Sequence, residues 1–176
     1  MNTLLETQLK RAKAAARLLK NMPTCTKNQA LDKIADALIV RSEEILEANK
    51  KDMAHAQEVN MTKAMQDRLL FTHERIVGVS DGVKKVATLP DPIGEVMESW
   101  TRPNGLEISK VRVPIGVFGI IYEARPNVTV DIAALCLKSE NACVLRGGKE
   151  AIHTNKKLVE IRMMPLKTSC QKGLLN

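Results

Sequence analysis

Residues 116–131 read GVFGIIYEARPNVTVD, an apolar run that passes into a polar loop and then into a helical pattern. The run 116–122 lacks alternating polar positions, which is typical of a strand buried on both faces of a parallel sheet. Apolar side chains recur at helical spacing over 128–138. This stretch therefore predicts a buried strand, a loop and a helix.

The next segment repeats this order. A short apolar strand is expected over 141–145, and Gly147-Gly148 turns the chain toward a helix over 150–161. A βαβα unit of this kind predicts an α/β fold with a parallel sheet. A doubly wound sheet needs further strands, so the expected sheet is incomplete.

Helical patterns dominate residues 1–88. Pro23 breaks the first pattern, because proline lacks the amide donor that a helix interior needs. Ser42 and Thr72 are expected to cap later helices, and the apolar stripes are expected to pack in the core. The expected helical segments are 3–20, 31–39, 42–56, 62–70 and 72–86.

Residues 93–113 are expected to form a β-hairpin. The prolines of Leu89-Pro90-Asp91-Pro92 end the preceding helix. Asn104-Gly105 lies at the expected turn, because both residues tolerate positive φ. A long hairpin exposes a strand edge, and a partner subunit would cover it. We therefore expect a homo-oligomer that forms through the hairpin.

The composition of the 176 residues narrows the classes of function. Hydrophobic residues make up 44% and charged residues 27%, as in ordinary globular proteins. The net charge of +7 suits anionic partners, but only 2% of residues are aromatic, which argues against stacking on nucleic-acid bases. The basic run in residues 1–20 is interpreted as a solvated helix face.

The sequence also suggests where the chain resides. It has no apolar run of membrane-spanning length and no signal peptide, so we expect a cytoplasmic protein that does not bind membranes. Its four cysteines are then expected to be thiols. Without a CxxC pair or a histidine cluster, no metal site is expected.

Polar and basic residues follow both strands of the predicted βαβα unit. Arg125 and Asn127 follow the first, and Arg146-Gly147-Gly148-Lys149 follow the second. Open α/β sheets bind ligands at the carboxyl ends of their strands. Two cations beside two glycines suit a phosphate, so these residues suggest an anion or nucleotide site. The alternative is an ordinary corner between a strand and a helix.

The same stretches carry a resemblance to a known family. Residues 113–131, and more briefly 89–95, 103–106, 135–139 and 145–153, closely resemble the γ-glutamyl phosphate reductases (glutamate-5-semialdehyde dehydrogenases). That family belongs to the aldehyde dehydrogenase superfamily. The resemblance is sharpest over 89–155 and looser over 1–88.

The resemblance implies a fold and a reaction. It implies that residues 1–161 are part of an aldehyde-dehydrogenase-type, Rossmann-like NADPH-binding domain, with a helical region over 1–88 and the hairpin as an oligomerisation arm. It also implies NADPH-dependent reduction of γ-glutamyl phosphate to glutamate 5-semialdehyde and phosphate, in proline biosynthesis. The family's reaction proceeds through a cysteine thiolate that forms a thioester.

The resemblance further implies roles for the site residues. Asn127 would donate to the oxyanion, and its alternative is a helix N-cap. Arg146, Gly147, Gly148 and Lys149 would lie at the cofactor; for the two cations the alternative is surface charge. Arg125 would hold substrate phosphate or carboxylate, or form a structural salt bridge. Glu123 and Asp131 are expected to orient neighbouring groups.

Several features depart from the family. The nucleophilic cysteine belongs to a catalytic domain that is expected to lie beyond this chain. Cys136 and Cys143 are expected to be buried and inert, and Cys25 and Cys170 have no supporting base in the sequence. The family usually has glycine where Glu140 stands, so strain is expected there. The resemblance ends near residue 161, and 162–176 is expected to be a disordered tail.

Because of these departures, we expect the isolated chain to be inactive. Three other functions are considered. The first is a non-catalytic fragment that pairs with a full-length subunit. An aldehyde dehydrogenase of other specificity is disfavoured by residues 122–131. A nucleic-acid binder is supported by charge alone.

Overall fold

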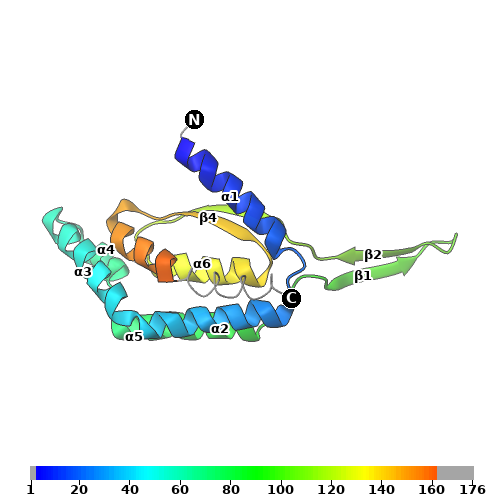
Figure 1. Ribbon diagram of the computed structural model, residues 1–176, viewed down its shortest axis with the longest axis horizontal. Coiled ribbons are helices and arrows are strands. Elements are labelled where there is room, and N and C mark those ends of the chain that lie inside the picture. The colour runs from blue at the N-terminus through cyan, green and yellow to red at the C-terminus, as the bar shows by residue number, and fades with distance from the viewer. Residues whose placement is uncertain (1–2, 162–176) are drawn as a thin grey trace, which may run out of the picture.

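The computed structural model describes residues 3–161, in which helices surround a small parallel sheet and a hairpin projects from one end (Figure 1). The helices are α1 (Thr3–Leu19), α2 (Thr24–Val40), α3 (Ser42–Glu58), α4 (Lys63–Leu69), α5 (His73–Thr88) and α6 (Asn127–Lys138). The strands are β1 (Val96–Thr101), β2 (Glu107–Val111), β3 (Val117–Ile121) and β4 (Ala142–Arg146). The expected tail and Cys170 lie outside the described residues.

Side-chain caps explain where two helices begin. Thr72 Oγ1 accepts a hydrogen bond from the Arg75 amide at 3.2 Å, as expected, and Thr62 caps α4 in the same way. The expected cap at Ser42 is wrong. Only Arg41 separates α2 from α3, so Ser42 already lies inside α3 and is buried.

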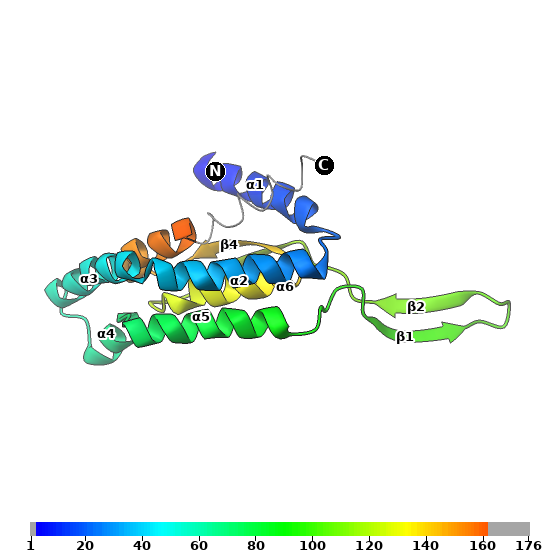
Figure 2. The same ribbon diagram turned by 60° about the horizontal axis from the view of Figure 1, so that its bottom comes forward.

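The core lies where α2, α5 and α6 pack together (Figure 2). The stripes predicted for these helices are confirmed, because Leu31, Ile34, Ile76 and Val130 are all buried in one cluster. Truncating a buried aliphatic side chain of this kind typically costs about 2–5 kcal/mol. This packing fixes α6, and α6 in turn positions the loop that follows β3.

The predicted βαβ order is confirmed, because β3 and β4 are parallel and in register from Val117↔Ala142 to Ile121↔Arg146. Figures 1 and 2 show α6 on one side of this sheet and α1 on the other. The expectation of a strand buried on both faces is wrong. The described residues form only a two-stranded sheet here, and Ile121 is 79% exposed.

The first helix is only partly packed. Leu19, at its end, packs against the core cluster, and Ala12 and Ala16 are half-buried. Leu5 and Leu9 belong to the same stripe but are 45% and 42% exposed, so their expected core packing is wrong. The start of α1 extends past the elements that its end contacts (Figure 1).

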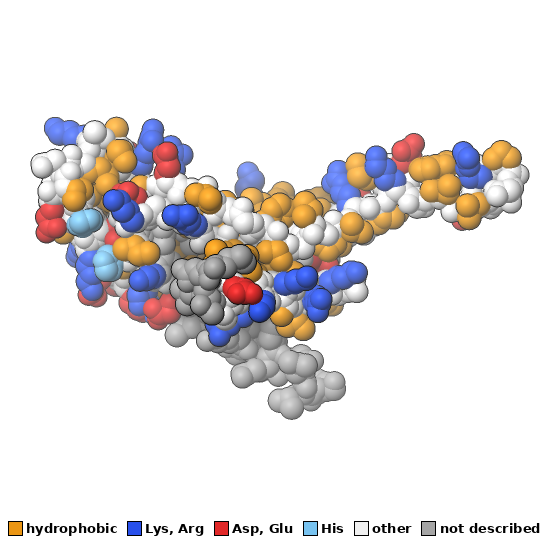
Figure 3. Space-filling model, turned by 90° about the horizontal axis from the view of Figure 1, so that it is seen from above, with side chains coloured by type: hydrophobic (Ala, Val, Ile, Leu, Met, Phe, Trp, Pro, Cys, Tyr) orange, Lys and Arg blue, Asp and Glu red, His pale blue; other side chains and the backbone are white. Residues whose placement is uncertain are grey.

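The predicted hairpin is confirmed by antiparallel pairing of β1 with β2. Gly105 has φ of 85° at its turn, and Asn104 Oδ1 accepts a hydrogen bond from the Leu106 amide at 3.2 Å. Both strands are exposed along nearly all their length. Trp100 faces Ile108 across the pair. Figure 3 shows apolar and basic side chains side by side along this arm.

The last described segment is tied to α3. A short 3₁₀ turn, η1 (Lys149–Ala151), precedes α-helical residues 152–161, so the expected helix begins as 3₁₀. Buried Asp52 accepts hydrogen bonds from the amides of His153 and Thr154 at 3.1 and 2.8 Å. This carboxylate satisfies amide groups that the start of a helix leaves without partners. None of the helices within 3–161 is both long and apolar enough to cross a bilayer.

Candidate functional site

Two loops meet at the carboxyl end of the parallel sheet. One connects β3 to α6, and the other follows β4. The Tyr122 amide donates to the Arg146 carbonyl oxygen at 3.1 Å, which continues the strand pairing into both loops. Arg125 and Asn127 on the first loop therefore lie at the same end of the sheet as Gly147 and Gly148 on the second.

Asn127 is held by its own helix. It is the first residue of α6, and Pro126 occupies the N-cap position without a side-chain cap bond. Asn127 Nδ2 donates to Asp131 Oδ2 at 3.0 Å, one turn further along. The N-cap alternative for Asn127 is therefore wrong. Asp131 orients the amide, as expected of it.

Asp131 lies in an unusual setting for a carboxylate. Burial raises the pKa of Asp131 above its ordinary value, and the hydrogen bond from Asn127 only partly offsets this effect. The residue also lines a groove of about 180 Å³ between α5 and α6, next to Val83, Val86 and Ala134. The carboxylate therefore retains an exposed side toward an apolar groove.

The cations of the site are available for a ligand. Arg125, Arg146 and Lys149 are all exposed, and none of them forms an ion pair with a carboxylate in residues 3–161. The salt-bridge alternative for Arg125 thus has no partner in the described part of the chain. Exposed guanidinium and ammonium groups suit phosphate oxygens.

The first glycine of the corner is required by internal packing. A Cβ at Gly147 would lie 2.3 Å from Asn155 Nδ2 and 3.1 Å from the Tyr122 ring. Asn155 is buried and fixed, because its Oδ1 accepts a hydrogen bond from Thr129 Oγ1 at 2.9 Å. The Tyr122 hydroxyl lies 2.5 Å from the same Thr129 oxygen.

This cluster of Tyr122, Thr129 and Asn155 was not predicted from the sequence. It locks the β3–α6 loop to residues 152–161. The glycine pair was the one signal in the sequence, because glycine allows another group to approach the backbone closely. It does not indicate whether that group belongs to a ligand or to the protein. The approaching groups at Gly147 belong to this chain.

The second glycine lies beneath an acidic side chain. A Cβ at Gly148 would lie 2.3 Å from Glu150 Oε2 and 3.5 Å from the Ala124 amide nitrogen. The Glu150 carboxylate therefore lies close over Gly148. The residue types fit a nucleotide: a carboxylate near a cation can accept from a ribose hydroxyl, and a nearby arginine can hold a 2′-phosphate.

The described cysteines differ in burial. Cys136 on α6 is buried, as expected, whereas Cys143 on β4 is only half-buried, because the described sheet leaves that strand incompletely covered. Cys25 is exposed and follows Thr24, which contacts Asp91 before the hairpin. That region is at the end of the sheet where β3 begins, whereas Asn127 follows the end of β3.

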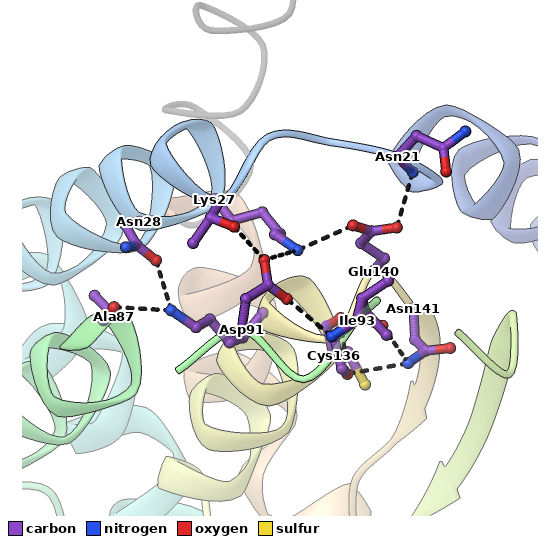
Figure 4. A network of polar contacts seen from close by, with 12 residues as sticks. Asn21, Lys27, Asn28, Ala87, Asp91, Ile93, Cys136, Glu140 and Asn141 are labelled. Carbon is purple, nitrogen blue, oxygen red and sulfur yellow. Dashed lines mark hydrogen bonds and ion pairs between the residues drawn. The ribbon is translucent and has the colours of Figure 1, made fainter. Parts of the chain in front are cut away.

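A buried ionic cluster lies at this opposite end, and it includes Asp91 from the segment that leads into the hairpin (Figure 4). Lys27 is fully buried, and its Nζ lies 2.5 Å from Asp91 Oδ2 and 3.0 Å from Glu140 Oε1. Lys138 Nζ donates to Asn28 Oδ1 at 2.7 Å and to the Ala87 carbonyl oxygen at 2.9 Å. The members of this cluster come from three segments that are far apart along the chain, so no local pattern in the sequence predicts it.

Comparisons with known proteins show which proteins the chain is similar to. No family model matches the chain. The chain is 52% identical over 169 residues to the γ-glutamyl phosphate reductase of a Geobacillus species, covering 96% of this chain and 41% of that protein. It is 55% identical over 150 residues to the γ-glutamyl phosphate reductase of Clostridium novyi, covering 85% of this chain and 36% of that protein.

Solved structures extend the similarity to three dimensions. The crystal structure of γ-glutamyl phosphate reductase from Thermotoga maritima matches with a TM-score of 0.91 and 44% identity, over 93% of this chain and 40% of that one. The Saccharomyces cerevisiae γ-glutamyl phosphate reductase matches with a TM-score of 0.86 and 36% identity, over 90% of this chain and 40% of that one.

A probable aldehyde dehydrogenase from Listeria monocytogenes is 16% identical with a TM-score of 0.68, over 95% of this chain and 34% of that one; it shares the fold. The chain spans about two fifths of the length of the curated relatives that it matches. In sequence and in structure, the chain is therefore related to the γ-glutamyl phosphate reductases, and it has part of the aldehyde dehydrogenase fold.

Proposed function

We propose that this chain contributes to the NADPH-dependent reduction of γ-glutamyl phosphate to glutamate 5-semialdehyde and phosphate, a step of proline biosynthesis in the cytoplasm. It would provide the residues of the active site that contact the cofactor. One observation carries the proposal: Arg125, Asn127 and the glycine corner all lie at the carboxyl end of the parallel β3–β4 pair. Ligands of open α/β sheets bind at this end.

Arg146 and Lys149 would hold the cofactor. Their charged groups flank Gly147-Gly148 and have no carboxylate partner in residues 3–161, so a phosphate of NADPH would supply their counter-charge. Bound NADPH supplies the hydride for the reduction. Glu150 lies over Gly148, and its negative charge would oppose binding of a phosphate there.

Asn127 would stabilise the oxyanion. Its Nδ2 carries two hydrogens, and Asp131 accepts one of them, which fixes the direction of the other. A donor with a fixed direction stabilises developing negative charge without reorganising during the reaction. Arg125, exposed on the same loop, would bind the substrate phosphate or carboxylate.

The 176-residue chain alone is expected to show no turnover. The family's reaction needs a thiolate beside the oxyanion donor. Within residues 3–161, Cys136 is buried, Cys143 is half-buried and Cys25 lies at the other end of the sheet from Asn127. The alternative function is a non-catalytic one, in which the chain pairs with a full-length reductase subunit through its exposed hairpin.

The test is titration of the purified chain with NADPH and NADH, followed by an assay of NADPH consumption with freshly generated γ-glutamyl phosphate. We expect saturable NADPH binding that Arg146→Ala weakens, and no consumption above background. Unchanged binding after Arg146→Ala would contradict the proposed cofactor site. Turnover by the chain alone would contradict the expected inactivity.

A further inference from the structure

The hairpin arm, formed by β1, its turn and β2, has little support along its length. The two strands pack against each other, and within residues 3–161 they make no comparable contact with another element. Figures 1 and 2 both show the arm projecting past the helices and the β3–β4 sheet. Its direction is therefore decided at its base, where residues 89–95 form the first leg of the arm and residues 112–116 form the second.

Each leg contains a glycine in a conformation that other residues rarely adopt. Gly94 has φ of 84° and Gly116 has φ of 120°, and a Cβ would meet no atom within 4 Å at either position. Glycine reaches these angles without steric cost, and no neighbouring atom crowds the two positions. Hinges consist of a few loop residues that absorb changes of φ and ψ. Both legs therefore contain a candidate pivot.

A largely buried ion pair holds the first leg. Asp91 Oδ2 lies 2.5 Å from Lys27 Nζ and accepts a hydrogen bond from Thr24 Oγ1, which ties the leg to the start of α2. Asp91 Oδ1 accepts a hydrogen bond from the Ile93 amide at 3.1 Å, so the leg is fixed just before its glycine. Lys27 is itself held by Glu140 Oε1, at 3.0 Å.

A side-chain amide holds the second leg. The Gly116 amide donates to Asn141 Oδ1 at 2.7 Å, and the Gly116 carbonyl oxygen accepts from the Ala142 amide at 2.9 Å. Asn141 is buried, and its Nδ2 donates to the Ser139 carbonyl oxygen at 2.7 Å, which fixes the direction of Oδ1. Figure 4 shows Asn141 beside Glu140, so the supports of the two legs meet in the turn that follows α6.

We propose that these contacts form a two-point clamp that fixes the direction of the hairpin arm, and that the arm pivots at its two glycines when either point is released. The clamp is defined by Asp91, on the first leg, and Asn141, which holds the second. The legs are also bonded to each other, because the Gly94 amide donates to the Arg112 carbonyl oxygen at 3.0 Å. Release of the clamp therefore moves the hairpin as one body without separating its strands.

The clamp prepares the arm for contact with another molecule. A flexible segment loses conformational freedom when it binds, and this loss weakens the affinity. An arm whose direction is already fixed avoids most of that loss. The inference does not depend on the proposed function, because every contact that it uses lies within this chain.

Trp100 lies on β1 and is the only tryptophan of the chain, so its fluorescence reports on the arm. The experiment is time-resolved fluorescence anisotropy of the 176-residue chain, at a concentration where sedimentation shows monomers. Asp91→Asn and Asn141→Ala are each expected to increase the amplitude of the nanosecond component at least about twofold, because loop motions reach this timescale. The double variant is expected to exceed the sum of the two effects, because a single point still restrains the arm.

Ser80→Ala is the matched control. It removes a buried hydrogen bond in the middle of α5, from Ser80 Oγ to the Ala35 carbonyl oxygen at 3.0 Å, and is expected to leave the anisotropy decay unchanged. Hydrogen exchange measured by mass spectrometry should show equal protection of residues 96–101 and 107–111 in all variants, because the hairpin keeps its own bonds.

An unchanged anisotropy decay in folded Asp91→Asn and Asn141→Ala variants would overturn the proposal. An equal change in Ser80→Ala would also contradict it, because the motion would then be a general effect of lower stability. Loss of protection in residues 96–101 would mean that the hairpin frays instead of pivoting. If circular dichroism shows that one variant does not fold, the other decides, since each releases a different leg; failure of both would assign these residues to the stability of the fold and contradict the clamp.

Discussion

Lys27 Nζ lies 3.0 Å from Glu140 Oε1, and Glu140 has a backbone φ of 55°. The strain expected where the family usually has glycine is therefore present, in a residue whose side chain is buried against an ammonium group. The Asn21 amide also donates to Glu140 Oε2, at 2.8 Å. A left-handed non-glycine residue costs on the order of 1–3 kcal/mol, and these contacts explain why glutamate is tolerated there.

Removing the charge of Glu140 is expected to destabilise the chain. Glu140→Gln keeps the backbone strain but leaves Lys27 with Asp91 as its carboxylate partner, so we expect a loss of about 2–3 kcal/mol in the free energy of unfolding. Urea denaturation measures the effect. Glu47→Gln, which removes an exposed ion pair with Lys51, is the control and should cost less than about 1 kcal/mol. Equal effects of the two changes would contradict the role assigned to the cluster.

The same cluster predicts a dependence of stability on pH. Burial alone would raise the pKa of Asp91, but hydrogen bonds from Lys27, Thr24 and the Ile93 amide outweigh it and hold this pKa below its ordinary value. A carboxyl whose pKa is lower in the folded state stabilises the fold above its unfolded pKa, and this contribution is lost as the pH falls through the folded value.

Asp91→Asn is therefore expected to lower stability at neutral pH and to flatten the loss of stability below about pH 4. Unfolding free energies measured between neutral and acidic pH would test this. Asp32→Asn, on the exposed side of α2, should leave the pH profile unchanged. If Asp91→Asn and Asp32→Asn give the same profile, the ionic contribution of Asp91 is absent.

The glycine corner offers a test by a single methyl group. Gly147→Ala places a Cβ 2.3 Å from Asn155 Nδ2 and 3.1 Å from the Tyr122 ring, so we expect a loss of about 1–3 kcal/mol. Gly119→Ala is the control, because a Cβ there meets nothing within 4 Å. Thermal unfolding should show a lower midpoint for Gly147→Ala only. A stable Gly147→Ala variant would mean that Asn155 can move aside.

Local signals in the sequence predicted much of the fold. The apolar stripes of α2, α5 and α6, the cap at Thr72 and the Asn104-Gly105 turn all depend on neighbours within a few residues, and these are confirmed. The expected burial of 116–122 failed for a different reason. The apolar composition of residues 116–122 is typical of a strand buried in a complete sheet. The described residues form only two strands of this sheet, so Ile121 is exposed.

Polar contacts over long sequence separations escaped prediction. Lys27 and Glu140 are 113 residues apart, and Thr129 and Asn155 are 26 apart, so no periodic pattern relates them. The N-cap alternative for Asn127 is wrong because Pro126 occupies that position. Asn127 instead donates to Asp131, four residues further along the same helix. The sequence placed the site residues at the ends of strands but not their partners.

The hairpin is expected to set the oligomeric state of the chain. Trp100 and Ile108 face each other across an exposed arm that carries few contacts with the rest of the described residues. Trp100→Asp should shift a concentration-dependent dimer toward monomer in sedimentation experiments, because it places a charge in an apolar contact. Arg102→Ala at the turn is the control. A dimer of unchanged affinity would place the interface elsewhere.

Removing a positive or a negative charge near Gly147-Gly148 is expected to change NADPH affinity in opposite directions. Arg146→Ala removes a phosphate partner and should weaken NADPH binding about tenfold, with a smaller effect on NADH, which lacks the 2′-phosphate. Glu150→Gln removes the negative charge that lies over Gly148 and should strengthen NADPH binding a few-fold. Fluorescence titration at two ionic strengths measures both effects, and the difference between the variants should shrink as salt screens the charges.

Lys156→Ala, exposed on the following helix, controls for net charge. If Glu150→Gln weakened NADPH binding instead, Glu150 would be a ribose ligand, and the corner would be built for a cofactor without the extra phosphate.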